Sequence, residues 1–163
     1  MSQFIRRITS QEVHAAWVIG YEAFPTGEKP LEETYVFRHK SAPELFWGLF
    51  ENDRLVGNLS ATRSSEVHIT NYSNNSHEPE GALVCVRTLC VHQDFRNKGV
   101  ATKLLKHFIQ YVQENVKNVR KMGLICHDNL IPMYVKLGFQ CRGLSEIPGD
   151  PPWYYMERSI GGN

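Results

Sequence analysis

Residues 91–108 read VHQDFRNKGVATKLLKHF and join a strand-like segment to a helix-like one. Ahead of them, the run ALVCVRTLCV at 82–91 is almost continuously apolar and β-branched, as in a strand buried on both faces. After Gly99, apolar side chains recur at helical spacing as far as Val116, with lysines and glutamines on the other face. The stretch therefore predicts a central strand, a polar turn and a helix that packs on a sheet.

The rest of the chain alternates between strand and helix signals. Periodicity and turn residues predict strands at 4–8, 45–51, 55–61, 121–126, 139–142 and 153–158, and helices at about 9–24, 31–40 and 128–138. Residues 64–80 are polar and predict a flexible surface loop. The order of elements predicts an α/β (α+β) fold with a mixed central sheet, flanking helices and right-handed crossovers.

Length and composition exclude several classes of protein. A chain of 163 residues is too short for two ordinary domains, so we expect a single domain over 1–163. A net charge of +1 gives no reason to expect a nucleic-acid or membrane partner. The N-terminus lacks the apolar core of a signal peptide, and no apolar run is long enough to span a bilayer, so we expect a soluble, cytoplasmic protein.

The cysteines and histidines do not predict a metal site. No CxxC pair occurs among Cys85, Cys90, Cys126 and Cys141, which are expected to be reduced. The seven histidines lack HxxxH or HxH spacing, so no metal is expected. We expect His39 to lie at the surface.

The turn before the predicted helix has the features of an anion site. Backbone N–H groups at a helix start are without intrahelical acceptors and lie at the positive end of the helix dipole. Gly99 would let a phosphate approach the backbone closely, and Arg96 and Lys98 add positive charge. An ordinary solvated turn fits the same pattern. Neither GxGxxG nor a Walker loop is present.

Two motifs carry a resemblance to a known family. RNKGVA at 96–101 resembles the R/Q-x-x-G-x-G/A signature of the GNAT superfamily of acetyl-CoA-dependent N-acetyltransferases. NLIPMYVKLGF at 129–139 is similar to the N-x-x-x-x-(L/P)-Y-x-x-x-G-F segment of the same superfamily. More narrowly, LCVHQDFRNKG, CHDNLIPMYVKLGFQ, YEAFPTGEKPL and RHKSAPELFWGLFENDRLVG resemble arylalkylamine N-acetyltransferases of the serotonin-acetylating type and their fungal polyamine-acetylating relatives.

This resemblance implies a GNAT acyltransferase fold, acetyl-CoA as co-substrate and a coenzyme site along the opening stretch. The residues that it implies for coenzyme binding are Leu89, Cys90, Val91, Arg96, Asn97, Lys98, Gly99, Val100, Ala101, Thr102 and Asn129. At the strand end a backbone N–H would face the thioester carbonyl. We therefore expect Cys90 to be a small packing residue rather than a nucleophile.

Acetyl transfer to an amine needs a proton donor for the thiolate and an acceptor for the ammonium proton. Tyr134 matches the tyrosine that acts as general acid in the resembled enzymes, with core packing as the alternative. Animal serotonin-type enzymes have two histidines where this chain has Cys85 and Arg87, and arginine cannot act as a base at ordinary pH. The candidate base is therefore His127, beside Asp128, with a capping or surface role as the alternative.

The acceptor is expected to be a small primary amine. The resemblance implies that the substrate-binding residues include Phe24, Pro30, Cys85, Arg87 and Tyr155. Arg87 either pairs with an internal carboxylate or lines the amine channel, where it would repel a polycation. An arylalkylamine or polyamine is the leading substrate, acetylated by direct attack in a ternary complex of a monomer or weak homodimer. The rivals are a protein or peptide N-acetyltransferase and a non-catalytic acyl-CoA-binding sensor.

Overall fold

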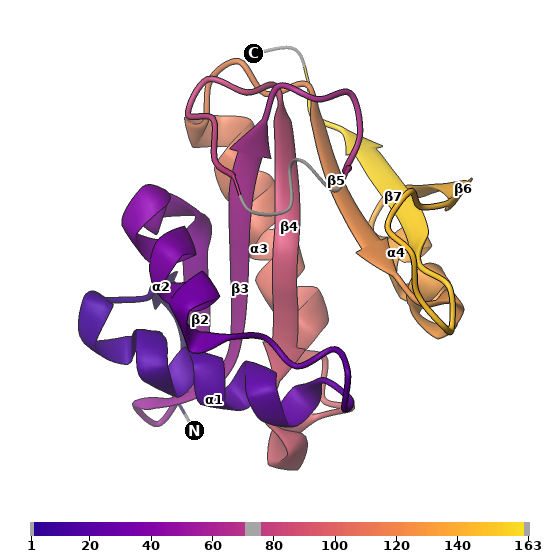
Figure 1. The fold of residues 1–163 in the computed structure, drawn as a ribbon. Coiled ribbons are helices and arrows are strands. Elements are labelled where there is room, and N and C mark those ends of the chain that lie inside the picture. The colour runs from indigo at the N-terminus through magenta and orange to yellow at the C-terminus, as the bar shows by residue number, and fades with distance from the viewer. Residues whose placement is uncertain (1, 71–75, 162–163) are drawn as a thin grey trace. The chain divides into compact units, whose positions relative to one another are not determined.

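The structure is a computed structural model that describes residues 2–70 and 76–161 (Figure 1). Its strands form a seven-stranded sheet in the order β1-β2-β3-β4-β5-β7-β6. Strands β4 and β5 pair in parallel, whereas β1, β2 and β3 pair antiparallel in sequence. The predicted mixed sheet flanked by helices is confirmed.

The elements follow the predicted boundaries closely. The strands are β1 (Gln3–Arg7), β2 (Phe46–Glu51), β3 (Arg54–Ser64), β4 (Leu83–Val91), β5 (Lys121–Cys126), β6 (Gln140–Leu144) and β7 (Tyr154–Ser159). The helices are α1 (Val13–Ala23), α2 (Glu32–Ser41), α3 (Val100–Asn115) and α4 (Ile131–Lys136), with 3₁₀ turns η1 (Ser10–Glu12), η2 (Pro43–Leu45), η4 (Gln93–Phe95) and η5 (Asp128–Leu130). The clearest difference is β3, which continues past Ala61 to Ser64.

Two compact units make up the chain. One comprises Met1–Ala61 and Arg87–Phe108, and the other comprises Thr62–Val86 and Ile109–Asn163. Strands β3 and β4 and helix α3 each contribute residues to both units. The single domain over 1–163 stays a prediction. In the described part of the chain, no helix is long and apolar enough to cross a membrane, and cytoplasmic localisation also stays a prediction.

In the first unit, Glu12 fixes the turn that leads from β1 into α1. Arg6 donates two hydrogen bonds of 2.8 Å to its carboxylate, and the Thr9 backbone N–H donates a third of 2.9 Å. The hydrogen bonds from Arg6 lower the pKa of Glu12 to about 2, so the carboxylate stays charged at neutral pH. This capping box satisfies backbone donors at the start of η1.

The core of the first unit lies between α1, α2 and the strands that they cover (Figure 1). The Tyr35 ring is fully buried and meets Phe46 edge-on, with ring centroids 6.0 Å apart. The Asn58 side-chain amide donates to the Ala16 carbonyl at 3.2 Å, which ties β3 to α1. Polar and aromatic contacts together therefore hold the two helices on the sheet.

His39 is half-buried, so its expected surface position is wrong. Its Nε2 atom lies 2.8 Å from the Ile8 carbonyl oxygen, and its ring packs against Phe46 with centroids 5.7 Å apart. The Ile8 carbonyl lies just after β1 and is partly buried, so it needs a hydrogen-bond donor. The His39 imidazole supplies that donor. The histidine joins α2 to the β1 edge of the unit.

In the second unit, a cluster of buried residues contains Leu83 and Cys85 of β4, Tyr155 of β7 and Ile69 of the loop before β4. Arg63 is also buried there, and its guanidinium donates to the Gly81 and Lys117 carbonyls at 2.8 and 2.9 Å. These bonds explain why β3 extends through a polar segment.

The predicted loop 64–80 is only partly described, because residues 71–75 lie outside the described residues. At its two ends, Ser65 donates to the Glu78 carboxylate through both its backbone N–H, at 3.1 Å, and its hydroxyl, at 2.7 Å. The described ends of the segment are thus hydrogen-bonded to each other. Flexibility of the whole loop stays a prediction.

The contact between Gly20 and Tyr35 makes a testable prediction about the first unit. A Cβ at Gly20 would lie 2.1 Å from the Tyr35 hydroxyl oxygen. Alanine is favoured over glycine in a helix by up to about 1 kcal/mol, but overpacking costs typically about 1–3 kcal/mol. We expect Gly20→Ala to lower the free energy of unfolding by about 1–2 kcal/mol, measured by urea denaturation.

Tyr35→Phe supplies the matched background for this substitution, because it removes the clashing hydroxyl. In that background Gly20→Ala should cost less or stabilise the protein, which gives a coupling energy between the two sites. A Gly20→Ala protein as stable as the parent in both backgrounds would contradict the contact.

Candidate active site

The turn between β4 and α3 has an unusual backbone. Asn97 and Gly99 both have positive φ angles, of 61° and 79°, on either side of Lys98. The Lys103 N–H donates to the Gly99 carbonyl at 3.0 Å, so the N–H groups of residues 100–102 precede the first intrahelical bond. A Cβ at Gly99 would meet no described atom within 4 Å. The turn is therefore open at its glycine and has several donors beside that opening.

Side-chain contacts hold this turn in place. His92 accepts the Asp94 N–H on its Nδ1 atom at 3.1 Å, and the Arg96 Nε donates to the Val91 carbonyl at 3.2 Å. The Lys98 ammonium lies 5.5 Å from the centre of the Phe95 ring. Arg96 and Lys98 are exposed, so their charges face solvent beside the N-terminus of the 16-residue helix α3. The turn fits an anionic diphosphate group.

The end of β4 leads directly into this turn. Leu89 and Val91 are half-buried, whereas Cys90 is only 5% exposed. The Cys90 thiol donates to the Asn58 side-chain oxygen at 3.5 Å. Burial raises the pKa of Cys90 to about 12, so the thiol stays protonated at neutral pH and is a poor nucleophile.

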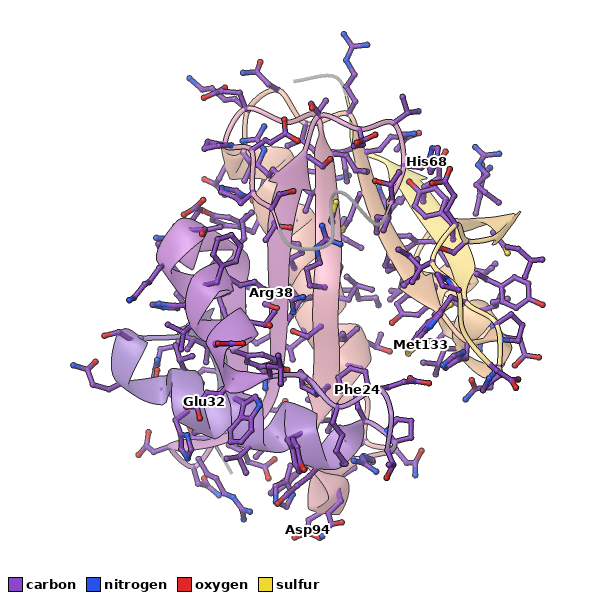
Figure 2. All side chains as sticks on the ribbon, viewed as in Figure 1. Phe24, Glu32, Arg38, His68, Asp94 and Met133 are labelled. Carbon is purple, nitrogen blue, oxygen red and sulfur yellow. The ribbon has the colours of Figure 1, made fainter. Side chains whose placement is uncertain are left out.

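The loop between α1 and α2 carries the first two residues implied for the substrate site. Phe24 follows α1 directly and is half-buried (Figure 2). Lys29 donates to the Phe24 carbonyl at 2.8 Å, and the Trp17 indole N–H donates to the Pro30 carbonyl at 3.0 Å. These bonds fix the backbone on which Phe24 and Pro30 are held.

Arg38 was not predicted from the sequence to be buried. It is buried, with 8% exposure, and Figure 2 shows it on α2, beside β3. Burial and, next, the charge of Arg87 lower the pKa of Arg38 to about 10, so the Arg38 guanidinium stays charged at neutral pH. Its spacing of three residues from the apolar Tyr35 could have indicated a position on the buried face of the helix.

In the second unit, Tyr134 lies on α4, directly after η5. Pro132 occupies the first turn, and Gly138, with a φ of 90°, ends the helix in a left-handed conformation. The Tyr134 side chain is 6% exposed and its ring meets Phe139 edge-on at 5.8 Å. Burial, with a smaller effect from Cys126, raises the pKa of Tyr134, so the phenol keeps its proton at neutral pH.

Pro152 and Trp153, in the segment before β7, both contact His127. Its Nδ1 atom lies 2.9 Å from the Pro152 carbonyl oxygen, and its ring stacks on Trp153 with centroids 3.8 Å apart and planes 24° apart. A carbonyl can only accept, so Nδ1 carries the proton and the lone pair of the neutral ring is on Nε2. This orientation is the one that a base acting through Nε2 requires.

Tyr155 lies beside a cavity of the second unit. The cavity has a volume of ≈ 410 Å³ and is lined mainly by the loop before β4, by β5 and by the β6–β7 hairpin. The Tyr155 hydroxyl is buried, and burial, followed by the neighbouring Glu157, raises the pKa of the phenol. Glu157 in the same cavity accepts from Lys121 at 3.0 Å and from Arg142 at 3.1 Å. His68, which Figure 2 labels, meets the Tyr155 ring edge-on, with ring centroids 6.0 Å apart.

The expected site residues fall in both units. The first unit contains Phe24, Pro30, Arg87, Leu89, Cys90, Val91, Arg96, Asn97, Lys98, Gly99, Val100, Ala101 and Thr102, and the second contains Cys85, His127, Asn129, Tyr134 and Tyr155. Cys85 and Tyr155 pack in one cluster, and Asn129 is exposed in η5. Within the ranges 2–70 and 76–161, no group of three or more His, Cys, Asp or Glu residues could hold a metal ion.

Comparisons with known proteins agree with this architecture. Residues 11–139 match the model of the acetyltransferase (GNAT) family. Serotonin N-acetyltransferase of Mesocricetus auratus is 33% identical over 142 residues, which cover 85% of this chain and 68% of that protein. The chain therefore belongs to the acetyltransferase (GNAT) family, and its enzyme class is that of the N-acetyltransferases.

Two solved structures illustrate the fold. The loading GNATL domain of CurA from Lyngbya majuscula superposes with a TM-score of 0.85 at 14% identity, over 98% of each chain. Naa50 of Arabidopsis thaliana, in complex with the bisubstrate analogue CoA-Ac-MVNAL, superposes with a TM-score of 0.75 at 18% identity, over 98% of this chain and 99% of that one. At these identities the likeness shows the fold alone.

The geometry of His127 predicts its tautomer. In the neutral ring, ¹⁵N chemical shifts should show a protonated Nδ1 and an unprotonated Nε2. His68 is the matched control, because its Nε2 lies 2.7 Å from a Glu146 carboxylate oxygen and should carry the proton of the neutral ring. A neutral His127 that is protonated mainly on Nε2 would contradict the bond to Pro152.

Proposed function

We propose that this protein transfers the acetyl group of acetyl-CoA to the primary amine of a small molecule, by direct attack in a ternary complex. The observation that carries the proposal is the turn before α3, with its open glycine, free helix-start donors and two exposed basic side chains. Membership of the acetyltransferase (GNAT) family supports it.

The coenzyme would be held by backbone groups. In this proposal, the N–H groups at the start of α3 bind its diphosphate, and Arg96 and Lys98 add charge. A backbone N–H near Cys90, at the end of β4, orients the thioester carbonyl. Bound acetyl-CoA would supply the acetyl group and a thiolate leaving group. The Cys90 side chain only packs, because its thiol is buried and protonated.

Two side chains of the second unit would handle protons. Tyr134 keeps its phenol proton because burial raises its pKa, and it would donate that proton to the departing thiolate. His127 has the lone pair of its neutral ring on Nε2, and it would take the ammonium proton of the acceptor directly or through water. Arg87 and the buried Cys85 cannot supply this function.

The class of amine follows from the relatives and from charge. The similarity to a serotonin N-acetyltransferase supports an arylalkylamine. Arg38 and Arg87 add two positive charges to the first unit, which disfavours a polyamine if the acceptor lies near them. Phe24 and Pro30 would form apolar walls for the acceptor in the first unit, and the expected role of Tyr155 in the second unit stays a prediction.

The proposal is tested with purified protein, acetyl-CoA and a panel of amines: tryptamine, phenylethylamine, spermine and a lysine-containing peptide. Release of free thiol with one of the small amines is the expected result. Release with the peptide alone would indicate a peptide N-acetyltransferase. Tight coenzyme binding without release for any amine would indicate an acyl-CoA sensor and overturn the proposal.

Tyr134→Phe should lower kcat by about 10²-fold or more, because it removes only the proton donor. Coenzyme affinity, measured by calorimetry, should change little. Tyr111→Phe on α3 is the matched control and should keep the parental rate. An unchanged kcat in Tyr134→Phe would exclude the phenol from proton transfer.

Two variants of Gly99 separate ligand approach from backbone strain. Alanine at a φ of 79° costs about 1–2 kcal/mol, whereas asparagine tolerates this conformation better. If the coenzyme approaches the glycine closely, both Gly99→Ala and Gly99→Asn should weaken CoA binding about tenfold, which is about 1.4 kcal/mol. Parental affinity in Gly99→Asn would show that the glycine only relieves strain.

A further inference from the structure

The rings of His127 and Trp153 form a face-to-face pair within the second unit. Their centroids are 3.8 Å apart and their planes are inclined by 24°. A histidine–tryptophan pair of the first unit is looser, because the ring of His14 lies 5.6 Å from that of Trp17 with planes inclined by 42°. The closer pair includes the histidine that the proposed function uses as the base, so the contribution of its tryptophan can be examined chemically.

The loop between β6 and β7 holds the indole of Trp153 (Figure 1). The Ser145 backbone N–H donates to the Trp153 carbonyl at 2.8 Å, which joins the two ends of the loop. Gly149 lies against the indole, since a Cβ at this position would be 2.6 Å from both Cδ1 and Nε1 of Trp153. A larger residue at 149 would therefore displace the ring that stacks on His127.

Both contacts of His127 favour the protonated form of its ring. The face of an indole carries negative charge density and attracts a cation within about 6 Å of its centre, and the 3.8 Å stack lies inside that range. The Pro152 carbonyl lies 2.9 Å from Nδ1, where it accepts the same N–H from the neutral ring and from the imidazolium. A proton gained by His127 is therefore bound at Nε2, and the ring need not turn to receive it.

The titratable residues that flank these contacts in the chain are Cys126, Asp128 and Asp150. Burial raises the pKa of Cys126 to about 11, so its thiol is neutral at neutral pH. Asp128 follows His127 and Asp150 lies in the β6–β7 loop, and both are exposed, so solvent screens their charges. A substitution at Trp153 leaves all three groups in the chain, and the contribution of the indole can be measured against this constant background.

We propose that Trp153 is a positioning residue for the base: its indole holds the His127 ring and raises the affinity of Nε2 for the proton of the acceptor's ammonium group. This inference rests on the proposed function, because a base is needed only if an amine is acetylated. The proton passes from the ammonium nitrogen to Nε2. The freed lone pair forms the bond to the acetyl carbon, and the electron pair of the broken C–S bond leaves with the coenzyme sulfur. The β6–β7 loop thereby sets the pH range in which His127 acts.

The first arm of the test is an NMR titration of the histidines and needs no acetyl transfer. Trp153→Leu removes the aromatic face and should lower the titration midpoint of His127 by about half a pH unit. Trp153→Phe keeps an aromatic face and should restore most of that difference. His14 is the internal control, because it lies in the first unit beside Trp17 and should titrate at the same pH in all three proteins.

Gly149→Ala displaces the indole without removing it, and should lower the midpoint of His127 in the same direction as Trp153→Leu. Gly161→Ala is the matched control, because a Cβ at Gly161 would meet no described atom within 4 Å. It should leave the midpoint of His127 unchanged. If Trp153→Leu does not fold, Gly149→Ala takes its place in both arms of the test.

The second arm measures kcat against pH with an amine that the parent acetylates. A base acts only when it is neutral, so kcat falls on the acidic side of the His127 midpoint. In Trp153→Leu this acidic limb should move about half a pH unit lower, as the midpoint does. The plateau kcat should fall about tenfold, because the ring is less well aimed. Trp153→Phe should restore most of both changes, whereas loss of a merely structural contact would lower kcat equally at every pH.

The outcomes separate this inference from the proposed function. A His127 midpoint that is the same in the parent and in Trp153→Leu would overturn the inference and leave the acetyl transfer standing. A shifted midpoint with an unmoved acidic limb would do the same, because another group would then be the base. Acetylation of no amine would overturn the proposed function and, with it, the role of Trp153 in catalysis. Midpoint and limb that move together, and return in Trp153→Phe, support both.

Discussion

The nine residues of strand β4 form backbone hydrogen bonds with the neighbouring strands, and the rest of the structure depends on this pairing. The side chains of the strand differ in what each could contribute to the proposed acetyl transfer. Its first residues pair with β5 in parallel register, from Leu83 opposite Lys121 to Cys85 opposite Gly123. Its last residues lead into the turn with the two positive φ angles. The hydrogen-bond ladder leaves little freedom in the strand, so the identity of each side chain along it decides which chemistry is available.

This constraint explains why the proton-handling groups are expected away from the strand. Cys85 is fully buried in an apolar cluster and Arg87 is a cation, so neither accepts a proton at neutral pH. His127 and Tyr134 come from the segment after β5 instead. A stacked indole and a carbonyl orient the first, and burial keeps the second protonated. Different elements can thus supply an acid and a base on one fold, because only their reach and protonation state matter.

Much of the fold could be predicted from the sequence, because its signals are local. Periodicity and turn residues located β5 at its observed bounds and found the helix after Gly99. The errors concern polar residues that long-range contacts bury. Arg63 extends β3 because its guanidinium donates to the Gly81 and Lys117 carbonyls, and His39 is half-buried because its imidazole bonds to the Ile8 carbonyl just after β1. No local pattern reports such partners.

The candidate site shows the same division. The turn and the position of Tyr134 could be inferred, because their motifs lie on contiguous residues. The stacking of Trp153 on His127 could not, because it joins residues 26 positions apart. Arg38 was equally inaccessible, since a charged residue on a helix is usually solvated and only the packing of Tyr35 beside it indicates otherwise.

Each compact unit is assembled from two separate stretches of chain, and this has a consequence for biosynthesis. The first unit needs residues 87–108, which leave the ribosome after the first stretch of the second unit has already emerged. Neither unit has its full sequence until synthesis is well past the midpoint of the chain, and the second must wait for the C-terminal strands. One unit therefore cannot finish folding before synthesis of the other has begun. While the first unit completes its fold, the second unit is present in the nascent chain only as an incomplete stretch.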